Sequence, residues 1–239
     1  MVKVKVCGIT NMADALAAVQ AGADLLGFIF YPASQRYVTP PQVRAIVTAV
    51  RQERPETVAV GVFVNETAAT VARVLDDCGL DAAQLHGDEP PYLLGLEPGR
   101  SSPLSGRAYR AVRPRTLDEA VQQGQAFALP STLRDERLPA LLMDTYHTSR
   151  MGGTGQVADW SVAAYLAAHY PLLLAGGLTP HNVAAAVQAV RPWGVDVASG
   201  VERSPGQKDH AALRAFVAAA RTAANEPAPP RPAVSGWII

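Results

Sequence analysis

The chain has 239 residues, and 21 Lys and Arg residues balance 21 Asp and Glu residues to a formal net charge of zero. This balance excludes a protein that works through a broad basic face for nucleic acid, and it excludes a polybasic membrane binder. Hydrophobic residues make up 49% of the chain, which excludes disorder over its whole length. Cys7 and Cys78 are too few for a disulfide framework or a zinc site, and the start of the chain does not resemble a secretory signal. We therefore expect a reducing, cytoplasmic setting.

The first half of the chain alternates short apolar runs with stretches of helical periodicity. Residues 3–7 (KVKVC) alternate in polarity and stop at Gly8, which predicts a strand. In chain order, strands are predicted over 3–7, 24–30, 57–64 and, more weakly, 81–85. Helices are predicted after these strands, from Asn11-x-x-Asp14, from Thr39-Pro40, around Val71, Val74 and Leu75, and near 90–96.

The second half repeats this alternation. Strands are predicted over 108–112, 140–143, 172–175 and 195–198. The helices that follow them are predicted from Thr116-x-x-Glu119, over 159–168, after Thr179-Pro180 and over 209–224. The whole chain thus reads as eight strand-then-helix units, each about 30 residues long, which is typical of α/β proteins.

Eight such units predict a single (β/α)₈ barrel, the TIM barrel, over residues 1–224. An open, doubly wound sheet is the alternative, but closure removes the edge strands that an open sheet must protect. Residues 225–239 form a proline-rich tail outside this domain. The connection over 97–107 is rich in Gly, Ser and Pro and does not fit the alternation.

In a TIM barrel the active site lies in the loops after the C-terminal ends of the strands. Polar, charged and glycine residues stand at each of these ends: Cys7, Arg36, Asn65, His86, Arg113, Asp144, Gly176-Gly177 and Ser199-Gly200. We expect these residues to surround one pocket.

The two glycine turns, Gly176-Gly177 and Ser199-Gly200, follow the last two strands. Glycine lets backbone N–H groups approach an anion, and these two loops are the usual phosphate site of such barrels. A tight turn without a ligand is the alternative for either turn alone. Residues 152–155 (GGTG) could form a third wall or a mobile lid.

Cys7 and Asp144 are the candidates for proton transfer. Cys7 lies at the end of a strand, where N–H dipoles can lower the pKa of its thiol and supply a thiolate base. Asp144 closes an apolar strand and could act as an acid, or it could only cap a loop.

Arg36 and His86 are candidates for binding. Arg36 could hold a carboxylate with its guanidinium, or it could form a surface ion pair. His86 could orient a substrate or be a hydrogen-bonded loop residue. No His, Asp or Glu cluster has the spacing of metal ligands, so we expect no metal.

Together these stretches resemble the phosphoribosylanthranilate isomerase family. The matching segments, in order, are KVCGIT (5–10), GFIFYPASQRYV (27–38), GVFVN (61–65), QLHGDE (84–89), Asp144 with GGTG (152–155), LAGGL (174–178), DVASGVE (196–202) and SPGQKD (204–209). The resemblance runs from about residue 2 to residue 222, and this ordered set is highly specific.

The resemblance implies an aldose–ketose isomerase of tryptophan biosynthesis. Its reaction is the Amadori rearrangement of N-(5-phosphoribosyl)anthranilate to 1-(2-carboxyphenylamino)-1-deoxyribulose 5-phosphate, with no cofactor. It implies Asp144 as the acid, Cys7 as the base, and Arg36 at the anthranilate carboxylate. Gly176, Gly177, Ser199 and Gly200 would bind phosphate, and His86 would bind substrate.

The resemblance has departures. Ala198 stands where the family often has serine, and the connections over 97–107 and 125–139 are longer than usual. The expected partner is a small phosphorylated substrate, without nucleic acid or membrane, for a monomer or a homodimer.

Two other functions remain open. A phosphate-binding lyase or synthase needs a lysine at a strand end, and Lys3, Lys5 and Lys208 do not suit that position. The other alternative is a protein that binds a phosphorylated metabolite without converting it.

Overall fold

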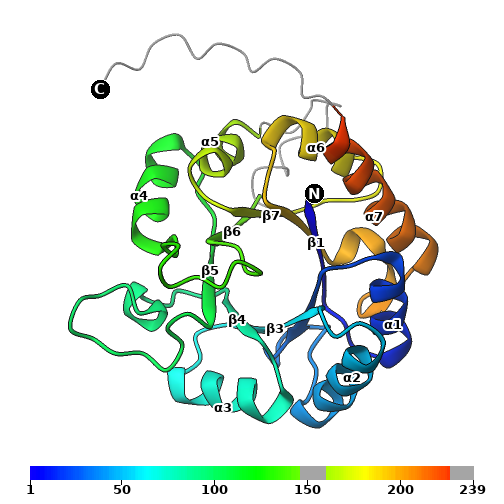
Figure 1. The fold of residues 1–239 in the computed structure, drawn as a ribbon, viewed down its shortest axis with the longest axis horizontal. Helices are drawn as coiled ribbons and strands as arrows, with labels where there is room; N and C mark the ends of the chain where they lie inside the picture. The colour runs from blue at the N-terminus through cyan, green and yellow to red at the C-terminus, as the bar shows by residue number, and fades with distance from the viewer. Residues whose placement is uncertain (146–159, 227–239) are drawn as a thin grey trace.

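The structure is a computed structural model that describes residues 1–145 and 160–226. Within these residues, eight parallel strands close into a barrel (Figure 1). The strands are β1 (Lys3–Cys7), β2 (Leu25–Ile29), β3 (Val58–Phe63), β4 (Ala82–Leu85), β5 (Ala108–Val112), β6 (Leu141–Asp144), β7 (Leu172–Ala175) and β8 (Gly194–Val197). Each strand pairs with the next along the chain, and β8 pairs with β1. The closed barrel, rather than the open sheet, is confirmed.

Helices form a ring around the barrel (Figure 1). In the described residues these are α1 (Met12–Ala21), α2 (Pro40–Glu53), α3 (Ala68–Cys78), α4 (Leu117–Phe127), α5 (Ser161–His169), α6 (Val183–Val190) and α7 (His210–Asn225). None of the helices in this part of the chain combines the length and apolarity of a membrane span.

Local capping explains where several helices begin. Asn11 Oδ1 accepts a hydrogen bond from the Asp14 N–H at 2.9 Å, and α1 starts at Met12. Thr39 and Gln42 form a capping box at the start of α2, and Thr116 accepts from the Glu119 N–H at the start of α4. These are the starts that the sequence predicts, and each such cap contributes about 1 kcal/mol.

The expected helix start at Thr179-Pro180 is wrong. Helix α6 begins three residues later, at Val183. The side chain of Asn182 accepts from the Thr179 N–H at 2.7 Å and donates to Gly177 O at 3.0 Å. Because Asn182 closes this turn, Thr179-Pro180 belongs to the turn and not to the helix.

Two connections differ from a simple strand–helix alternation. After β4 the chain forms a 3₁₀ helix, η1 (Pro91–Leu94), where the sequence predicts a short helix. After β8 it forms a second 3₁₀ helix, η3 (Ser199–Val201), and an unpredicted hairpin of β9 (Glu202–Ser204) and β10 (Gln207–Lys208).

The connection over 97–107 packs against its own barrel. Ser102 Oγ donates to Leu93 O at 2.6 Å, and Leu104 is fully buried. The guanidinium of Arg100 lies 3.5 Å from the centre of the Tyr92 ring. The connection over 125–139 likewise packs against the protein through two buried side chains, Leu129 and Leu138.

The barrel encloses a buried polar cluster beneath its C-terminal end. Lys5 on β1 lies opposite Asp196 on β8 in the pairing register, and Lys5 Nζ is 3.0 Å from Asp196 Oδ2. Lys5 also donates to Gln84 Oε1 at 2.9 Å, and Tyr109 OH donates to the same oxygen at 3.1 Å. This cluster joins β1, β4, β5 and β8 directly below the site.

Candidate active site

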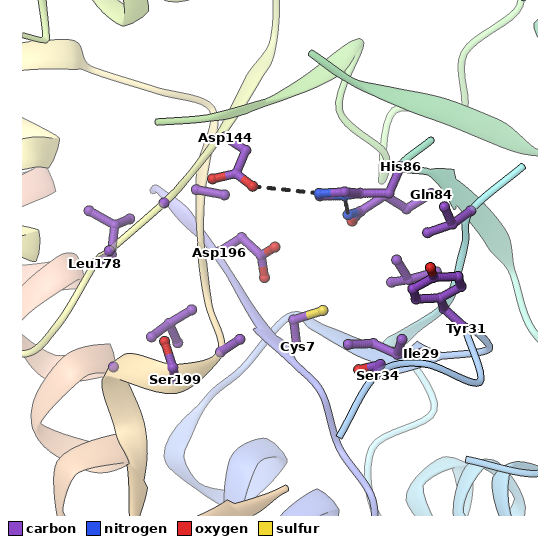
Figure 2. Close-up of a pocket in the computed structure, with 18 residues that line it drawn as sticks. Cys7, Ile29, Tyr31, Ser34, Gln84, His86, Asp144, Leu178, Asp196 and Ser199 are labelled. Atoms are coloured by element: carbon purple, nitrogen blue, oxygen red, sulfur yellow. Dashed lines mark hydrogen bonds and ion pairs between the residues drawn. The ribbon is translucent and has the colours of Figure 1, made fainter. Parts of the chain in front are cut away.

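A cavity of about 310 Å³ opens at the C-terminal end of the barrel. It is lined by the last residues of the strands and by the loops that follow them (Figure 2). The residues predicted from sequence that line it are Cys7, His86, Asp144, Gly176, Gly177, Ser199 and Gly200. Parallel strands bring their C-terminal ends to one face, so residues far apart in sequence meet here.

Cys7 and Asp144 lie on different sides of this cavity. Cys7 is the last residue of β1, and Asp144 is the last residue of β6. Figure 2 shows Asp196 between them, with all three side chains directed at the same space. A substrate in the cavity would therefore meet a thiol on one side and a carboxyl group on the other.

Cys7 is almost completely buried, with 6% of its surface exposed. Burial raises the pKa of the Cys7 thiol, while the ammonium of Lys5 opposes this rise. The direction is the reverse of the one expected from nearby helix N–H groups. Burial is the cause, and no helix N-terminus offsets it, because α1 begins only at Met12 and the Ile9 N–H in between donates to Gly27 O.

Gly27 on β2 makes room for this thiol. A Cβ at position 27 would lie 2.7 Å from Cys7 Sγ and 3.1 Å from Cys7 Cα, both too close for ordinary contact. The absence of a side chain at Gly27 therefore allows Cys7 to lie where it does.

His86 connects Asp144 to the buried polar cluster. His86 Nε2 lies 3.5 Å from Asp144 Oδ2, and His86 Nδ1 lies 2.7 Å from Gln84 Nε2 (Figure 2). Arg113 Nε is 3.9 Å from the same oxygen of Asp144, and Arg113 Nη2 donates to His86 O at 3.2 Å. The imidazole of His86 is thus held at both ends.

Arg36 lies beside the cavity and is bound by Glu202. Its Nε donates to Glu202 Oε1 at 2.9 Å, and its Nη2 donates to Glu202 Oε2 at 2.6 Å. Its side chain crosses Gly8, where a Cβ would come within 2.6 Å of Arg36 Cδ. Among the described residues the cavity lining includes its neighbours Tyr31 and Ser34 but not Arg36 itself.

The two glycine turns meet at one side of the cavity. Gly176 and Gly177 have φ angles of 98° and 65°, which favour glycine. A Cβ on Gly200 would lie 1.9 Å from Leu178 O, so the second turn fits against the first only as glycine. This places two stretches of backbone at one end of the cavity. Residues 152–155, predicted as a third wall or lid, lie outside the described residues.

Asn65 has another role. Its φ of 55° is unusual for a residue other than glycine, and Asn65 Oδ1 accepts from the Asp88 N–H at 2.6 Å. The Asn65 N–H donates to the buried Glu89, which forms an ion pair with Arg110. Asn65 thus ties the loop after β3 to the loop after β4.

Sequence reasoning missed three polar residues of the barrel interior: Lys5, Gln84 and Asp196. Gln84 and Asp196 line the cavity, and Asp196 Oδ1 is buried with no hydrogen-bond partner among the described residues. The signal was available, because alternate residues of a strand share a face. Lys5 shares a face with Cys7, and Gln84 shares one with His86.

The described residues hold no group of three or more His, Cys, Asp or Glu side chains arranged for a metal ion. The lysines are all engaged. Lys3 pairs with Asp24, and Lys5 pairs with Asp196. Lys208 Nζ donates to Cys7 O at 2.6 Å, Ala198 O at 3.1 Å and Glu202 Oε1 at 2.9 Å. This arrangement does not favour a lysine-dependent lyase or synthase.

Comparison with known proteins shows the family of this chain. Residues 4–219 match the family model described as N-(5'phosphoribosyl)anthranilate (PRA) isomerase. The N-(5'-phosphoribosyl)anthranilate isomerase of Pelobacter propionicus is 44% identical over 226 residues, which cover 95% of this chain and 99% of the relative.

Solved structures agree as well. The phosphoribosyl anthranilate isomerase of Thermotoga maritima is 38% identical with a TM-score of 0.75, covering 93% of this chain and 100% of that one. A phosphoribosyl anthranilate isomerase in complex with reduced 1-(o-carboxyphenylamino)-1-deoxyribulose 5-phosphate is 36% identical with a TM-score of 0.73, at the same coverage. The chain therefore belongs to the N-(5'-phosphoribosyl)anthranilate isomerase family.

Proposed function

We propose that this protein converts N-(5-phosphoribosyl)anthranilate to 1-(2-carboxyphenylamino)-1-deoxyribulose 5-phosphate in tryptophan biosynthesis. The observation that carries the proposal is the position of Cys7 and Asp144 on different sides of one cavity. An aldose–ketose isomerisation needs an acid and a base that act on neighbouring atoms of one sugar. Membership of the isomerase family supports the same reaction.

Asp144 is the proposed acid. Protonated Asp144 donates to the ring oxygen of the ribose, and the bond between C1 and that oxygen breaks. The product is an open-chain Schiff base with a positive charge at nitrogen. This charge acidifies the hydrogen on C2, so ring opening prepares the next step.

Cys7 is the proposed base. The proton on C2 passes to the Cys7 thiolate, the form that the Lys5 ammonium favours against burial, and the electrons neutralise the Schiff base to give an enolamine. C1 then gains a proton and the C2 hydroxyl loses one, which forms the ketone and returns Cys7 and Asp144 to their starting states. The atoms balance without an external oxidant or reductant, so we propose no cofactor.

Substrate binding follows from the remaining groups. The backbone of Gly176, Gly177, Ser199 and Gly200 is proposed to hold the 5-phosphate. Arg36 Nη1, which Glu202 does not occupy, is proposed to hold the anthranilate carboxylate. Asp196 lines the cavity, and its buried Oδ1, which has no hydrogen-bond partner among the described residues, is proposed to accept a hydrogen bond from a sugar hydroxyl. The partner is thus a small phosphorylated molecule. We propose that the protein itself works in the cytoplasm.

Replacement of the two proton-transfer groups tests this function. Cys7→Ser and Asp144→Asn should each lower kcat by about 10²–10⁴-fold, the usual contribution of such a group. Cys78→Ser is the matched control, because Cys78 is the other buried thiol and lies in α3. It should keep the wild-type kcat in a fluorescence assay of anthranilate derivatives.

Two outcomes would contradict the proposal. If Cys7→Ser and Asp144→Asn convert the substrate as fast as the wild type, these roles are wrong. If the wild-type protein binds the product tightly but converts no substrate, the protein is a binder of phosphorylated metabolites and not an isomerase.

A further inference from the structure

Four side chains form a continuous chain from the barrel interior to the proposed acid. Lys5 Nζ donates to Gln84 Oε1 at 2.9 Å, and Gln84 Nε2 lies 2.7 Å from His86 Nδ1. His86 Nε2 lies 3.5 Å from Asp144 Oδ2. The four residues come from β1, from β4 and its following loop, and from β6 (Figure 2 shows the last three).

Lys5 determines the orientation of the Gln84 amide. Burial lowers the pKa of Lys5, but its interactions with Asp196, Cys7 and Tyr109 together outweigh burial and raise it, so the group is an ammonium. An ammonium only donates hydrogen bonds, so the amide atom that faces it must be the carbonyl oxygen. Tyr109 OH donates to the same oxygen at 3.1 Å. The amide nitrogen of Gln84 therefore faces His86.

The amide nitrogen of Gln84 in turn determines where His86 carries its proton. An amide NH₂ group only donates, so His86 Nδ1 must accept and carries no proton. A neutral imidazole then carries its proton on Nε2, the nitrogen that faces Asp144 Oδ2. A proton on Nδ1 would place two donors 2.7 Å apart.

We propose that Lys5 and Gln84 are positioning residues that hold His86 in the Nε2–H form, so that His86 donates to Asp144 and cannot take its acidic proton. The catalytic part of this inference rests on Asp144 as the acid of the proposed function. In the opposite tautomer a bare Nε2 would face the carboxyl group. An imidazole is ordinarily a stronger base than a carboxylate by more than about two pKa units, so it would remove the proton that ring opening needs.

The position of the proton on His86 is directly measurable. Long-range ¹H–¹⁵N correlation spectra of protein labelled with ¹⁵N-histidine distinguish the two ring nitrogens, and His86→Gln assigns the resonances among the five histidines. The expected result for the wild type without ligand is a protonated Nε2 and a bare Nδ1. A wild-type spectrum with a protonated Nδ1 overturns the proposal.

Two variants test the chain of contacts from Lys5 through Gln84 and His86 to Asp144. Gln84→Glu replaces the amide with a group that accepts at both ends, so it should shift the proton to Nδ1 and lower kcat by about tenfold or more, with KM changed less. Tyr109→Phe is the matched control. It removes the second donor to Gln84 Oε1 but keeps Lys5, so the tautomer should stay as in the wild type.

The outcomes separate this inference from the proposed function. If Gln84→Glu shifts the proton but leaves kcat unchanged, or lowers kcat without shifting the proton, the positioning role of Gln84 is wrong. If Gln84→Glu does not fold, Gln84→Met takes its place. The expected result is then that His86 no longer stays in the single Nε2–H form. If His86 keeps that form in Gln84→Met, the positioning role of Gln84 is wrong. If the wild type shows no isomerase activity, the proposed function fails, while the wild-type spectrum still decides the tautomer.

Discussion

Arg36 and Glu202 form a bidentate ion pair across 166 positions of sequence, with Arg36 Nη2 at 2.6 Å from Glu202 Oε2. Lys208 donates to the other oxygen, Glu202 Oε1, at 2.9 Å and to the backbone oxygen of Cys7 at 2.6 Å. The proposed carboxylate-binding residue is therefore tied through two buried side chains to the strand end that carries the proposed base. A surface ion pair, the alternative reading of Arg36, does not describe this arrangement, because the Glu202 side chain is only 4% exposed.

Arg36→Ala should weaken substrate binding more than turnover. A hydrogen bond to a charged group is worth about 1.5–3 kcal/mol, so KM should rise by about 10- to 100-fold while kcat falls less. Arg51→Ala is the control, because Arg51 is an exposed α2 residue that pairs with Asp81. A KM for Arg36→Ala that equals the wild-type value would show that Arg36 does not hold the carboxylate.

Glu202 should contribute to stability in a pH-dependent way. Burial raises the pKa of Glu202, but the hydrogen bonds and positive charges of Arg36 and Lys208 together outweigh burial and hold it below its ordinary value of 4.5. As the pH falls below that value, the unfolded chain binds more protons than the native protein. The free energy of unfolding therefore decreases as the pH falls. This contribution is present above about pH 4.5 and is lost as the pH falls through the lower native pKa.

Urea unfolding at a series of pH values between pH 7 and pH 3 measures this loss. Glu202→Gln should reduce the free energy of unfolding at pH 7 and make its acid dependence shallower. Glu56→Gln, at an exposed glutamate paired with Arg54, should leave the dependence unchanged. An equally steep dependence in Glu202→Gln would exclude Glu202 as its source.

Gly27→Ala should displace the Cys7 thiol. The new Cβ would lie 2.7 Å from Cys7 Sγ, and overpacking of this kind costs about 1–3 kcal/mol. We expect a lower free energy of unfolding and a lower kcat, because the proposed base moves. Gly124→Ala in α4 is the matched control, since its Cβ would come equally close, 2.7 Å, to a Tyr170 ring carbon. It should lose stability and keep kcat; loss of kcat in both variants would mean that the effect at Gly27 is not local.

Gly200→Ala should damage the proposed phosphate site. Its Cβ would lie 1.9 Å from Leu178 O, so the two glycine turns would have to separate. KM for the phosphorylated substrate should rise, and inhibition by inorganic phosphate should weaken. Gly79→Ala, at the end of α3 with φ of 67° and nothing within 4 Å, serves as the control for a strained glycine outside the cavity. Unchanged phosphate inhibition in Gly200→Ala would place the phosphate elsewhere.

Local sequence patterns predicted the strands, most helix starts and the residues at the strand ends. The alternation of side chains in β1 is visible in five consecutive residues. The caps at Asn11, Thr39 and Thr116 involve residues within about four positions of each other, so a single stretch of chain contains both partners. The hairpin of β9 and β10 was not predicted, because its two strands have only three and two residues and show no periodicity. Thr179-Pro180 misled the prediction because Asn182 Oδ1 accepts from the Thr179 N–H and closes a turn before the first helical residue, Val183.

The amino-acid sequence by itself determined that this chain forms eight strand–helix units and that Cys7 and Asp144 end two of its strands. Only the tertiary structure decided which buried charges face each other. Lys5 meets Asp196 because β8 closes onto β1, and Arg36 meets Glu202 because the loops after β2 and β8 reach the same side of the barrel. Such pairs depend on closure of the whole sheet and on the cost of burying a charge alone, and no local pattern records either of these.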